Sequence, residues 1–454
     1  MPTLLVRNAH VLVTMDAQHR EISGGGLFAT DGVITEVGPT DDLPTYADEV
    51  VDARDRLVLP GLVNTHHHLY QSLTRAVPGA QNTSLFEWLR TLYPIWARLD
   101  PNSVRVATTL GLLELARSGC TTAFDQQYLW PNGSRVDDQI EAAQRVGLRF
   151  HASRGSMSLS EKDGGLPPDS VVQTTDEILA DSARVIDAFQ DPTRGSMTRI
   201  VLAPCSPFSV TEDLMRQTAA LARDRGVRLH THLAETRDEE RFTIDRFGKR
   251  PVDYAADLGW LGNDVWFAHG VFVGNDEITR MASTGTGVAH CPTSNMRLAS
   301  GIAPVGAYLD AGVPVGLGVD GSASNDSGNL LAEARQALLL NRLAVSPEIG
   351  EGPQMQARTA LEMATKGGAA VLGRDDIGAL EVGRMADFLT LDLNRPEFAG
   401  ALHDPVAAAV LCGPVPAYSV YVAGRPVIGR GHHVSIDERA LVEEHNRMAQ
   451  ALVG

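Results

Sequence analysis

Lysine is nearly absent from this chain of 454 residues. Only Lys162, Lys249 and Lys366 occur, so almost all of the 39 basic side chains are arginines. Acidic side chains number 56, and the formal net charge is −17. A surface of this sign repels a phosphate backbone unless a local basic strip compensates, and the sequence contains no such strip. We therefore expect no nucleic-acid partner, and a nucleobase substrate would be the free base.

Cysteines and long apolar runs are also scarce. The four cysteines are widely separated, without the paired spacings that predict disulfides or a thiolate zinc site. No apolar run reaches the roughly 20 residues of a membrane span. The N-terminal stretch Met1–Arg7 lacks the basic residues, apolar core and cleavage site of a signal peptide. We expect a cytoplasmic protein with no membrane partner.

The two ends of the chain share a β-rich pattern. Apolar residues alternate with polar ones in parts of the first 56 residues, and strand-like runs return at Ala386–Leu391 and Ser419–Val427. A final helix follows, opening near Glu438. This pattern predicts one small β-sandwich domain built from both termini, residues 1–56 and 376–454, which includes the C-terminal helix.

Between these ends, apolar runs alternate with helical patterns. One such helix spans Ser103–Ser118 and has Gly119 as a candidate C-cap. Eight β-then-α units in about 300 residues match a (β/α)₈ TIM-type barrel, which we predict over residues 57–375. A doubly wound open sheet is the alternative, but no Gly-x-Gly-x-x-Gly follows the first strand. The strand candidates are Leu57–Asn64, Thr121–Asp125, Leu148–Arg154, Arg199–Pro204, Arg228–Leu233, Val265–Gly270, Gly287–Cys291 and Val313–Val319.

Histidines and a carboxylate stand where these strands end. His66 and His68 are two residues apart and share a face of the first strand, whereas His67 faces the other way and is predicted to be structural. His232 and Asp320 end later strands, and all strand ends of a barrel meet at one face. Imidazole and carboxylate groups bind zinc or similar ions. The sequence therefore predicts one divalent metal ion held by these four residues, with zinc (Zn²⁺) favoured and iron (Fe²⁺) as the alternative.

Two further residues suit proton transfer at such an ion. Glu235 follows His232 by three residues, so it can approach a metal-activated water without being a ligand. Because an amine leaves only after its nitrogen receives a proton, Glu235 is predicted to be the proton shuttle. His269 is predicted to orient the water or stabilise developing charge. Asp320 could also take the proton of the water, which makes it a second candidate for acid–base work.

Any one of these residues alone would be read as a packing or hydrogen-bonding residue. The histidines His151, His230 and His290, which lie within or at the ends of strands, are read in that way, as hydrogen-bonded core residues. The set of polar residues at successive strand ends is what favours catalysis. A catalytically silent scaffold or binding protein is the alternative from another class, and it is disfavoured because every candidate ligand is present.

Four sequence strings carry a family resemblance. Pro60–His68, His232–Glu235, Ala268–Gly270 and Gly318–Asp320 resemble the amidohydrolase superfamily, specifically its mononuclear aminohydrolase branch. The resemblance covers essentially the entire chain. It implies a barrel with a β-sandwich from both termini, hydrolytic removal of an amino group from a ring carbon, and the ligand and proton-shuttle roles given above. By analogy we also expect a homo-oligomer.

The number of metal ions follows from a missing residue. Barrels of this kind with two metals commonly bridge them with a modified lysine at the end of the fourth strand. Here that strand ends at Pro204 and is followed by Cys205, with no lysine nearby. One ion is therefore predicted.

Longer segments resemble bacterial 8-oxoguanine deaminases, with triazine aminohydrolases such as hydroxyatrazine ethylaminohydrolase as near relatives. These segments are His67–Arg75, Leu92–Arg98, Arg154–Leu159 and Asn295–Gly301. The resemblance implies that 8-oxoguanine is converted to 8-oxoxanthine (urate) and ammonia. However, Gln126-Gln127 stands where a histidine pair is expected, and Trp130 replaces a phenylalanine. Another ring therefore remains the alternative, namely an s-triazine, guanine or isocytosine.

A flat heterocycle needs an aromatic or aliphatic slot and a few polar contacts at its edges. Phe86, Trp88 and Tyr93, in the long connection after the first strand, could supply the slot. Gln71 takes the place of a glutamine that contacts the base in guanine deaminases, and Arg154 is the second candidate for a polar contact. The expected partner is thus a small-molecule heterocyclic substrate, contacted by Gln71, Trp88 and Arg154.

Overall fold

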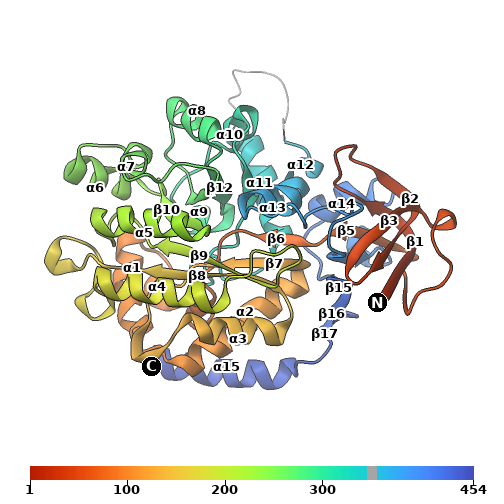
Figure 1. Ribbon diagram of the computed structural model, residues 1–454, viewed down its shortest axis with the longest axis horizontal. Coiled ribbons are helices and arrows are strands. Elements are labelled where there is room, and N and C mark those ends of the chain that lie inside the picture. Colours follow the sequence, from red (N-terminus) through yellow and green to blue (C-terminus); the bar gives the residue numbers. More distant parts are fainter. Residues whose placement is uncertain (345–354) are drawn as a thin grey trace.

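The computed structural model describes residues 1–344 and 355–454. Eight parallel strands close into a barrel surrounded by helices, and a separate sheet lies beside it (Figure 1). The predicted TIM-type fold is therefore confirmed. The barrel strands are β6 (Leu62–Asn64), β7 (Cys120–Asp125), β8 (Arg149–Ser156), β9 (Thr198–Pro204), β10 (Arg228–Leu233), β11 (Val265–His269), β12 (Gly287–His290) and β13 (Val315–Leu317).

Local signals in the sequence fix many helix ends. In α2, Asp100 caps the N-terminus through a reciprocal capping box with Ser103, and Gly119 ends the helix at φ 106°. The helices are α1 (Leu85–Trp96), α2 (Pro101–Ser118), α3 (Val136–Val146), α4 (Thr175–Phe189), α5 (Glu212–Arg225), α6 (Arg237–Phe247), α7 (Pro251–Asp257), α8 (Asn275–Thr284), α9 (Pro292–Arg297), α10 (Val305–Ala311), α11 (Leu330–Ala344), α12 (Ala357–Glu362), α13 (Gly368–Val371), α14 (Pro405–Leu411) and α15 (Glu438–Val453). No helix in the described parts of the chain is both long and apolar enough to cross a membrane.

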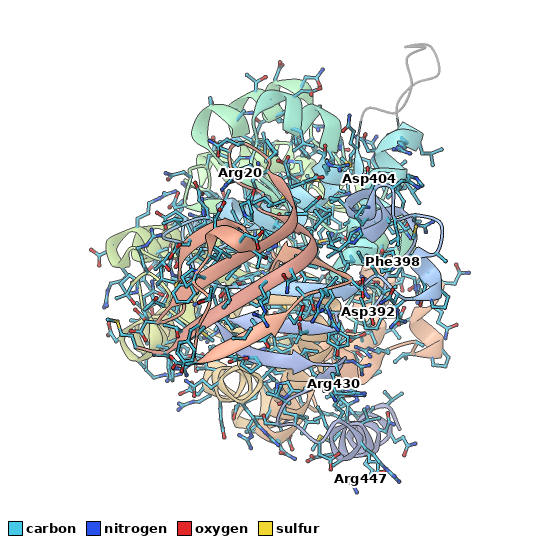
Figure 2. All side chains as sticks on the ribbon, turned by 90° about the vertical axis from the view of Figure 1, so that its right-hand side faces the viewer. Arg20, Asp392, Phe398, Asp404, Arg430 and Arg447 are labelled. Carbon is cyan, nitrogen blue, oxygen red and sulfur yellow. The ribbon has the colours of Figure 1, made fainter. Side chains whose placement is uncertain are left out.

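Strands from both ends of the chain form one nine-stranded sheet, in the order β17-β16-β15-β14-β5-β1-β2-β3, with β4 paired to β1. This confirms that the termini build a sheet of their own. Figure 2 is viewed onto this part of the molecule. Its strands are β1 (Thr3–Val13), β2 (Glu21–Thr30), β3 (Val33–Pro39), β4 (Glu49–Asp52), β5 (Arg56–Pro60), β14 (Phe388–Asp392), β15 (Ser419–Val422), β16 (Arg425–Gly429) and β17 (His432–His433).

The apolar run predicted as a single strand, Leu57–Asn64, is divided at Gly61. Its first part is β5, which pairs with β1 and β14 in the terminal sheet, and its second part is β6 of the barrel. A Cβ at Gly61 would lie 2.1 Å from Thr121 Oγ1, so only glycine fits where the chain passes between the two sheets. Periodicity does not reveal such a division, because both parts are buried on both faces.

The C-terminal helix α15 packs against the barrel, although the sequence grouped it with the terminal sheet. His445 Nε2 lies 3.0 Å from Ser72 Oγ, in the short 3₁₀ helix η2 (Leu69–Thr74) that follows β6. Leu452 joins the apolar cluster that includes Trp88 and Trp96 of α1. Figure 2 shows α15, marked by Arg447, at the edge of the molecule away from most of the sheet.

A buried ion pair joins the barrel to the terminal sheet. Arg149, the first residue of β8, donates to both carboxylate oxygens of Asp387, at 2.6 and 3.0 Å. The two side chains are 0% and 2% exposed. Asp387 also accepts a hydrogen bond from the backbone N–H of Ala423. Removing one partner of such a pair leaves an uncompensated buried charge.

We therefore expect Asp387→Asn to lower the free energy of unfolding by about 3–5 kcal/mol, because Arg149 stays buried without its counter-ion. Urea unfolding monitored by circular dichroism measures the change. Asp52→Asn is the control, since it removes an exposed pair with Arg54 and should change stability little. Equal losses in the two variants would contradict a special role for the buried pair.

Candidate active site

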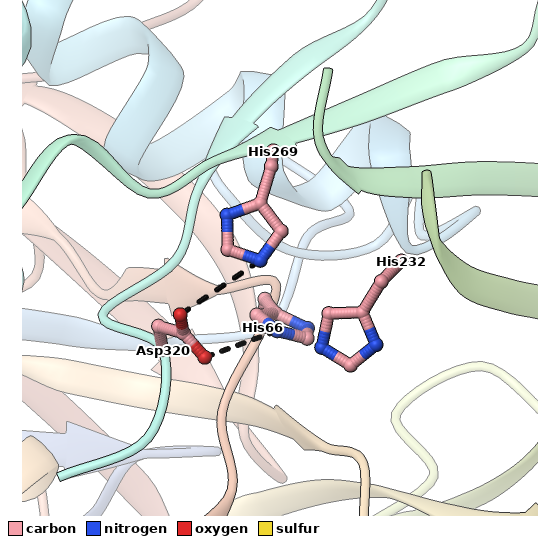
Figure 3. Close-up of side chains that lie close together, drawn as sticks. All are labelled: His66, His232, His269 and Asp320. Carbon is pink, nitrogen blue, oxygen red and sulfur yellow. Dashed lines mark ion pairs between the residues drawn. The ribbon is translucent and has the colours of Figure 1, made fainter. Parts of the chain in front are cut away.

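Six polar side chains predicted from the sequence converge at the carboxyl ends of the barrel strands. Figure 3 shows four of them, with dashed lines from Asp320 to His66 and His269. One ligand atom each from His66, His232, His269 and Asp320 lies within 4.8 Å of the others. The fifth, His68, places Nε2 at 3.0 Å from His232 Nε2 and 3.3 Å from Asp320 Oδ1. The sixth, Glu235, is described below.

The hydrogen bonds of two rings fix where their lone pairs point. Nδ1 of His68 and Nδ1 of His232 each lie 2.6 Å from a backbone carbonyl oxygen, of Gln126 and Cys205 respectively. A carbonyl only accepts, so each Nδ1 carries the proton and each Nε2 of the neutral ring carries a lone pair. Burial, with a contribution from His66, lowers the pKa of His68 to about 3, which keeps that ring neutral. Two lone pairs therefore face each other across 3.0 Å.

The third ring, His66, is oriented by another histidine. His230 Nδ1 lies 3.0 Å from the carbonyl of Trp266, so its Nε2 is free to accept the proton of His66 Nδ1 at 2.9 Å. His230 is thus the hydrogen-bonded core histidine that was predicted. His66 Nε2 is buried and makes no hydrogen bond among the described residues, although it lies 3.3 Å from Asp320 Oδ1.

Lone pairs and a carboxylate that converge in this way repel one another unless a cation lies among them. Neutral imidazole nitrogens with an ionised carboxylate are a donor set for zinc and similar divalent ions. Burial tends to raise the pKa of Asp320, but the neighbouring imidazoles outweigh it and hold the pKa well below its usual range. The residues present therefore fit a divalent metal ion.

The backbone around the cluster adopts conformations that are unusual for residues other than glycine. Asp320 has φ 62° and His269 has φ 73°, both in the left-handed region. Each such residue costs about 1–2 kcal/mol and persists only where its surroundings fix it. For the Asp320 loop, Val319 is held on both sides: its N–H donates to Asn64 Oδ1, and its carbonyl accepts from Asn325 Nδ2. Asp320 therefore projects its carboxylate toward the histidines.

Glu235 and His269 form an acid–base pair beside the cluster. Glu235 Oε2 lies 3.6 Å from His269 Nε2, which in turn lies 3.8 Å from Asp320 Oδ2. Burial raises the pKa of Glu235, with His269 opposing this shift and Asp320 adding to it. Burial lowers the pKa of His269, but the two carboxylates together outweigh burial and raise it. Both shifts favour the protonated form of the group concerned, so a proton between the two side chains is stabilised.

A cavity opens beside these residues. Of the predicted substrate contacts, Gln71 and Trp88 line it, and Trp88 Nε1 donates to the carbonyl of Ala323. The sequence did not single out several other lining residues, because no motif marks them. These residues are Leu85, Leu89, Tyr128, Cys205, Ser206, Phe208, Leu298 and Ser324.

Arg154 is not among the described residues that line this cavity, contrary to the sequence prediction. Its guanidinium is buried and donates to Asp181 at 2.6 Å and to Gln173 at 2.8 Å. Of the three predicted slot aromatics, only Trp88 borders the cavity, whereas Phe86 packs on Phe208 with ring centroids 4.9 Å apart. The sequence placed Arg154 near the end of a strand. That position alone does not determine whether a long side chain points toward the barrel axis or toward the surrounding helices.

A closed barrel with a buried histidine–carboxylate cluster at its strand ends is the arrangement of a metal-dependent hydrolase. The sequence pattern of the amidohydrolase family matches residues 57–427. This chain belongs to the amidohydrolase family and is a hydrolase that acts on carbon–nitrogen bonds.

Individual relatives match over nearly the full length. The chain is 48% identical to an 8-oxoguanine deaminase of Pseudomonas aeruginosa, over 95% of both chains. It is 41% identical to a hydroxydechloroatrazine ethylaminohydrolase of Pseudomonas sp. strain ADP, over 97% of this chain and 94% of the relative. The crystal structure of an atrazine chlorohydrolase from Arthrobacter aurescens, complexed with zinc, superimposes with a TM-score of 0.92 at 34% identity, covering 99% of this chain and 100% of that one.

The bond between His66 and His230 gives a prediction about metal affinity. His230→Leu removes the acceptor that holds the proton on His66 Nδ1, so we expect the metal to bind about 10–100-fold more weakly. Competition with a chromophoric chelator measures the affinity. His290→Leu is the matched control, because His290 is an equally buried histidine of β12, and its ring makes no hydrogen bond to His66, His68 or His232 among the described residues. Equal weakening in both variants would show a general packing effect instead.

Proposed function

We propose that this protein is a metal-dependent deaminase of a free amino-substituted oxopurine, with 8-oxoguanine as the substrate and 8-oxoxanthine (urate) and ammonia as products. The observation that carries the proposal is Glu235: a buried carboxyl group at the edge of the metal-binding cluster, with a raised pKa. Release of an amine requires such a proton donor. The 48% identical relative, an 8-oxoguanine deaminase, supports this choice of ring.

His66, His68, His232 and Asp320 would hold one divalent ion, for which zinc is the favoured identity. When bound, such an ion lowers the pKa of a water molecule to about 7 and so supplies a nucleophile at neutral pH. The zinc in the similar chlorohydrolase structure supports this identity.

The protein's own groups would then move the protons. The ionised carboxylate of Asp320 accepts a proton from the attacking water, and His269 stabilises the charge that develops on the attacked ring. Glu235, protonated before the bond breaks, gives its proton to the leaving nitrogen. Because Glu235 and Asp320 flank His269 at 3.6 and 3.8 Å, the proton travels a short path between the two carboxylates.

The cavity supports an uncharged flat ring. Among the described residues that line it there is no lysine or arginine, so no side chain there can pair with a phosphate or a carboxylate of the substrate. Trp88 offers an aromatic surface, and the buried Nε2 of Gln71 has no partner among the described residues, which leaves it free to donate to a ring acceptor. A free base fits these features better than a nucleotide does.

A different ring is the second candidate. The 41% identical ethylaminohydrolase supports an s-triazine, and the apolar lining residues Leu85, Leu89 and Leu298 could accommodate an alkylated amine. Guanine and isocytosine remain further alternatives. A catalytically silent protein is disfavoured because the ligand set and Glu235 converge on one point.

A substrate screen tests the choice of ring. We expect 8-oxoguanine to give the highest kcat/KM among free 8-oxoguanine, guanine, isocytosine and hydroxyatrazine, with ammonia or ethylamine release as the readout. The 8-oxoguanine nucleotide should not be turned over, because its phosphate would be buried without a counter-ion. A higher kcat/KM for the triazine would replace the oxopurine assignment. Absence of amine release from every ring would remove the deaminase proposal itself.

A substitution tests the proton shuttle. Glu235→Gln should keep the metal but lower kcat by about 100-fold or more, since the amide cannot carry the proton. Steady-state kinetics and metal analysis of the same preparation measure the two effects. In contrast, His66→Ala should lose the metal. Turnover that is unchanged in Glu235→Gln would assign the proton transfer to another residue.

A further inference from the structure

A second buried carboxylate, Glu239, lies directly behind Glu235. It belongs to the first turn of α6 and is 0% exposed. No arginine or lysine pairs with it in the described part of the chain. Its two oxygens instead accept backbone N–H groups, from Ala234 at 2.7 Å and from Glu235 itself at 2.9 Å. Burial raises the pKa of Glu239 to about 7, and the two N–H groups oppose this shift because they stabilise the ionised form.

These two hydrogen bonds stabilise a turn whose backbone conformation is unfavourable. Ala234 has φ 56°, a left-handed conformation that residues other than glycine rarely adopt. Its carbonyl is held as well, because it accepts from the N–H groups of Val271 and Phe272, each at 2.8 Å, in the loop after β11. The Ala234 residue is thus fixed from one side by α6 and from the other by the loop that follows His269.

The turn decides where the Glu235 side chain points. Glu235 follows the end of β10 by two residues, and a regular continuation of that strand would carry its side chain away from the metal-binding cluster. Because the chain turns at Ala234, the Glu235 carboxylate instead lies 3.6 Å from His269 Nε2 and within 3.4 Å of Ser300 Oγ. An error of about 1 Å at such a position costs much of the rate.

We propose that Glu239 is a positioning residue. It holds the Glu235 carboxylate beside His269 through the hydrogen bonds that it accepts from the two backbone N–H groups. The inference rests on the proposed role of Glu235 as proton shuttle. Glu239 touches neither the metal-binding histidines nor the cavity, so it acts only through Glu235 and the turn.

The test compares Glu239→Gln with Glu240→Gln. In Glu239→Gln, one acceptor oxygen becomes an NH₂ group that faces a buried N–H, so the turn loses a bond. We expect kcat to fall about 10–100-fold, while KM stays within about twofold and the metal content per chain is unchanged. Glu240, its neighbour, is also buried but pairs with Arg237 and Arg250, so Glu240→Gln should keep the wild-type kcat even if it lowers Tm.

A double variant distinguishes a positioning role of Glu239 from a general effect on protein stability. If Glu239 acts through Glu235, the double variant Glu235→Gln/Glu239→Gln should be no slower than Glu235→Gln alone. Multiplied losses in the double variant, or an unchanged kcat in Glu239→Gln, would overturn the proposal. Should Glu239→Gln fail to fold, Glu239→Asp serves in its place, since the shorter side chain keeps the charge but cannot reach both N–H groups.

A crystal structure of Glu239→Gln supplies a readout that does not depend on activity. We expect the Glu235 carboxylate to move away from His269, and a carboxylate that stays in place would overturn the inference. If Glu235→Gln kept full turnover, the proposed shuttle would fail, yet this structure would still decide whether Glu239 positions Glu235.

Discussion

The structure of the site depends on the repulsion among inward-facing lone pairs and a carboxylate. His66, His68 and His232 each donate Nδ1–H to a partner outside the cluster, so each Nε2 lone pair points toward Asp320 or another ring. At separations of 3.0–3.3 Å these groups are stable together only when a cation lies among them. A bound divalent ion would relieve this repulsion, and it would thereby couple the stability of the barrel face at the carboxyl ends of the strands to the metal.

The surroundings of each titratable group in the cluster shift its pKa in a definite direction. Burial lowers the pKa of His66, His68 and His232, which favours their neutral form. The pKa of Asp320 lies well below its usual range, because the interactions with His66 and His269 outweigh burial. Glu235 lies farther from these rings, so burial dominates and raises its pKa. Two carboxyl groups at one site therefore differ in proton affinity, and the difference supports the proposed roles of Asp320 as proton acceptor and Glu235 as proton donor.

Regular features of this fold were predictable, and their exceptions have physical causes. The bounds of β10 follow from a run of buried residues and the end of α2 from its glycine cap, and both signals are local in sequence. The six residues at strand ends followed from barrel geometry. The division at Gly61, the outward turn of Arg154 and the packing of α15 on the barrel depend on contacts with distant segments, through Thr121, Asp181 and Ser72. The left-handed turns at Ala234, His269 and Asp320 have no local signal, since none of these residues is glycine.

The charge of the site also supports the proposal of a single ion. Cys205 stands at the end of β9, its carbonyl holds His232, and no lysine lies among the described residues that line the cavity. One divalent ion set against the ionised Asp320 and neutral imidazoles leaves one net positive charge, which negative charge developing on the attacked ring can neutralise. A second divalent ion would add two positive charges to a buried region where burial raises the pKa of the next carboxyl group, Glu235, and so disfavours the ionised form that would hold them. The scarcity of lysine and the charge balance of the site therefore both support the proposal of one ion.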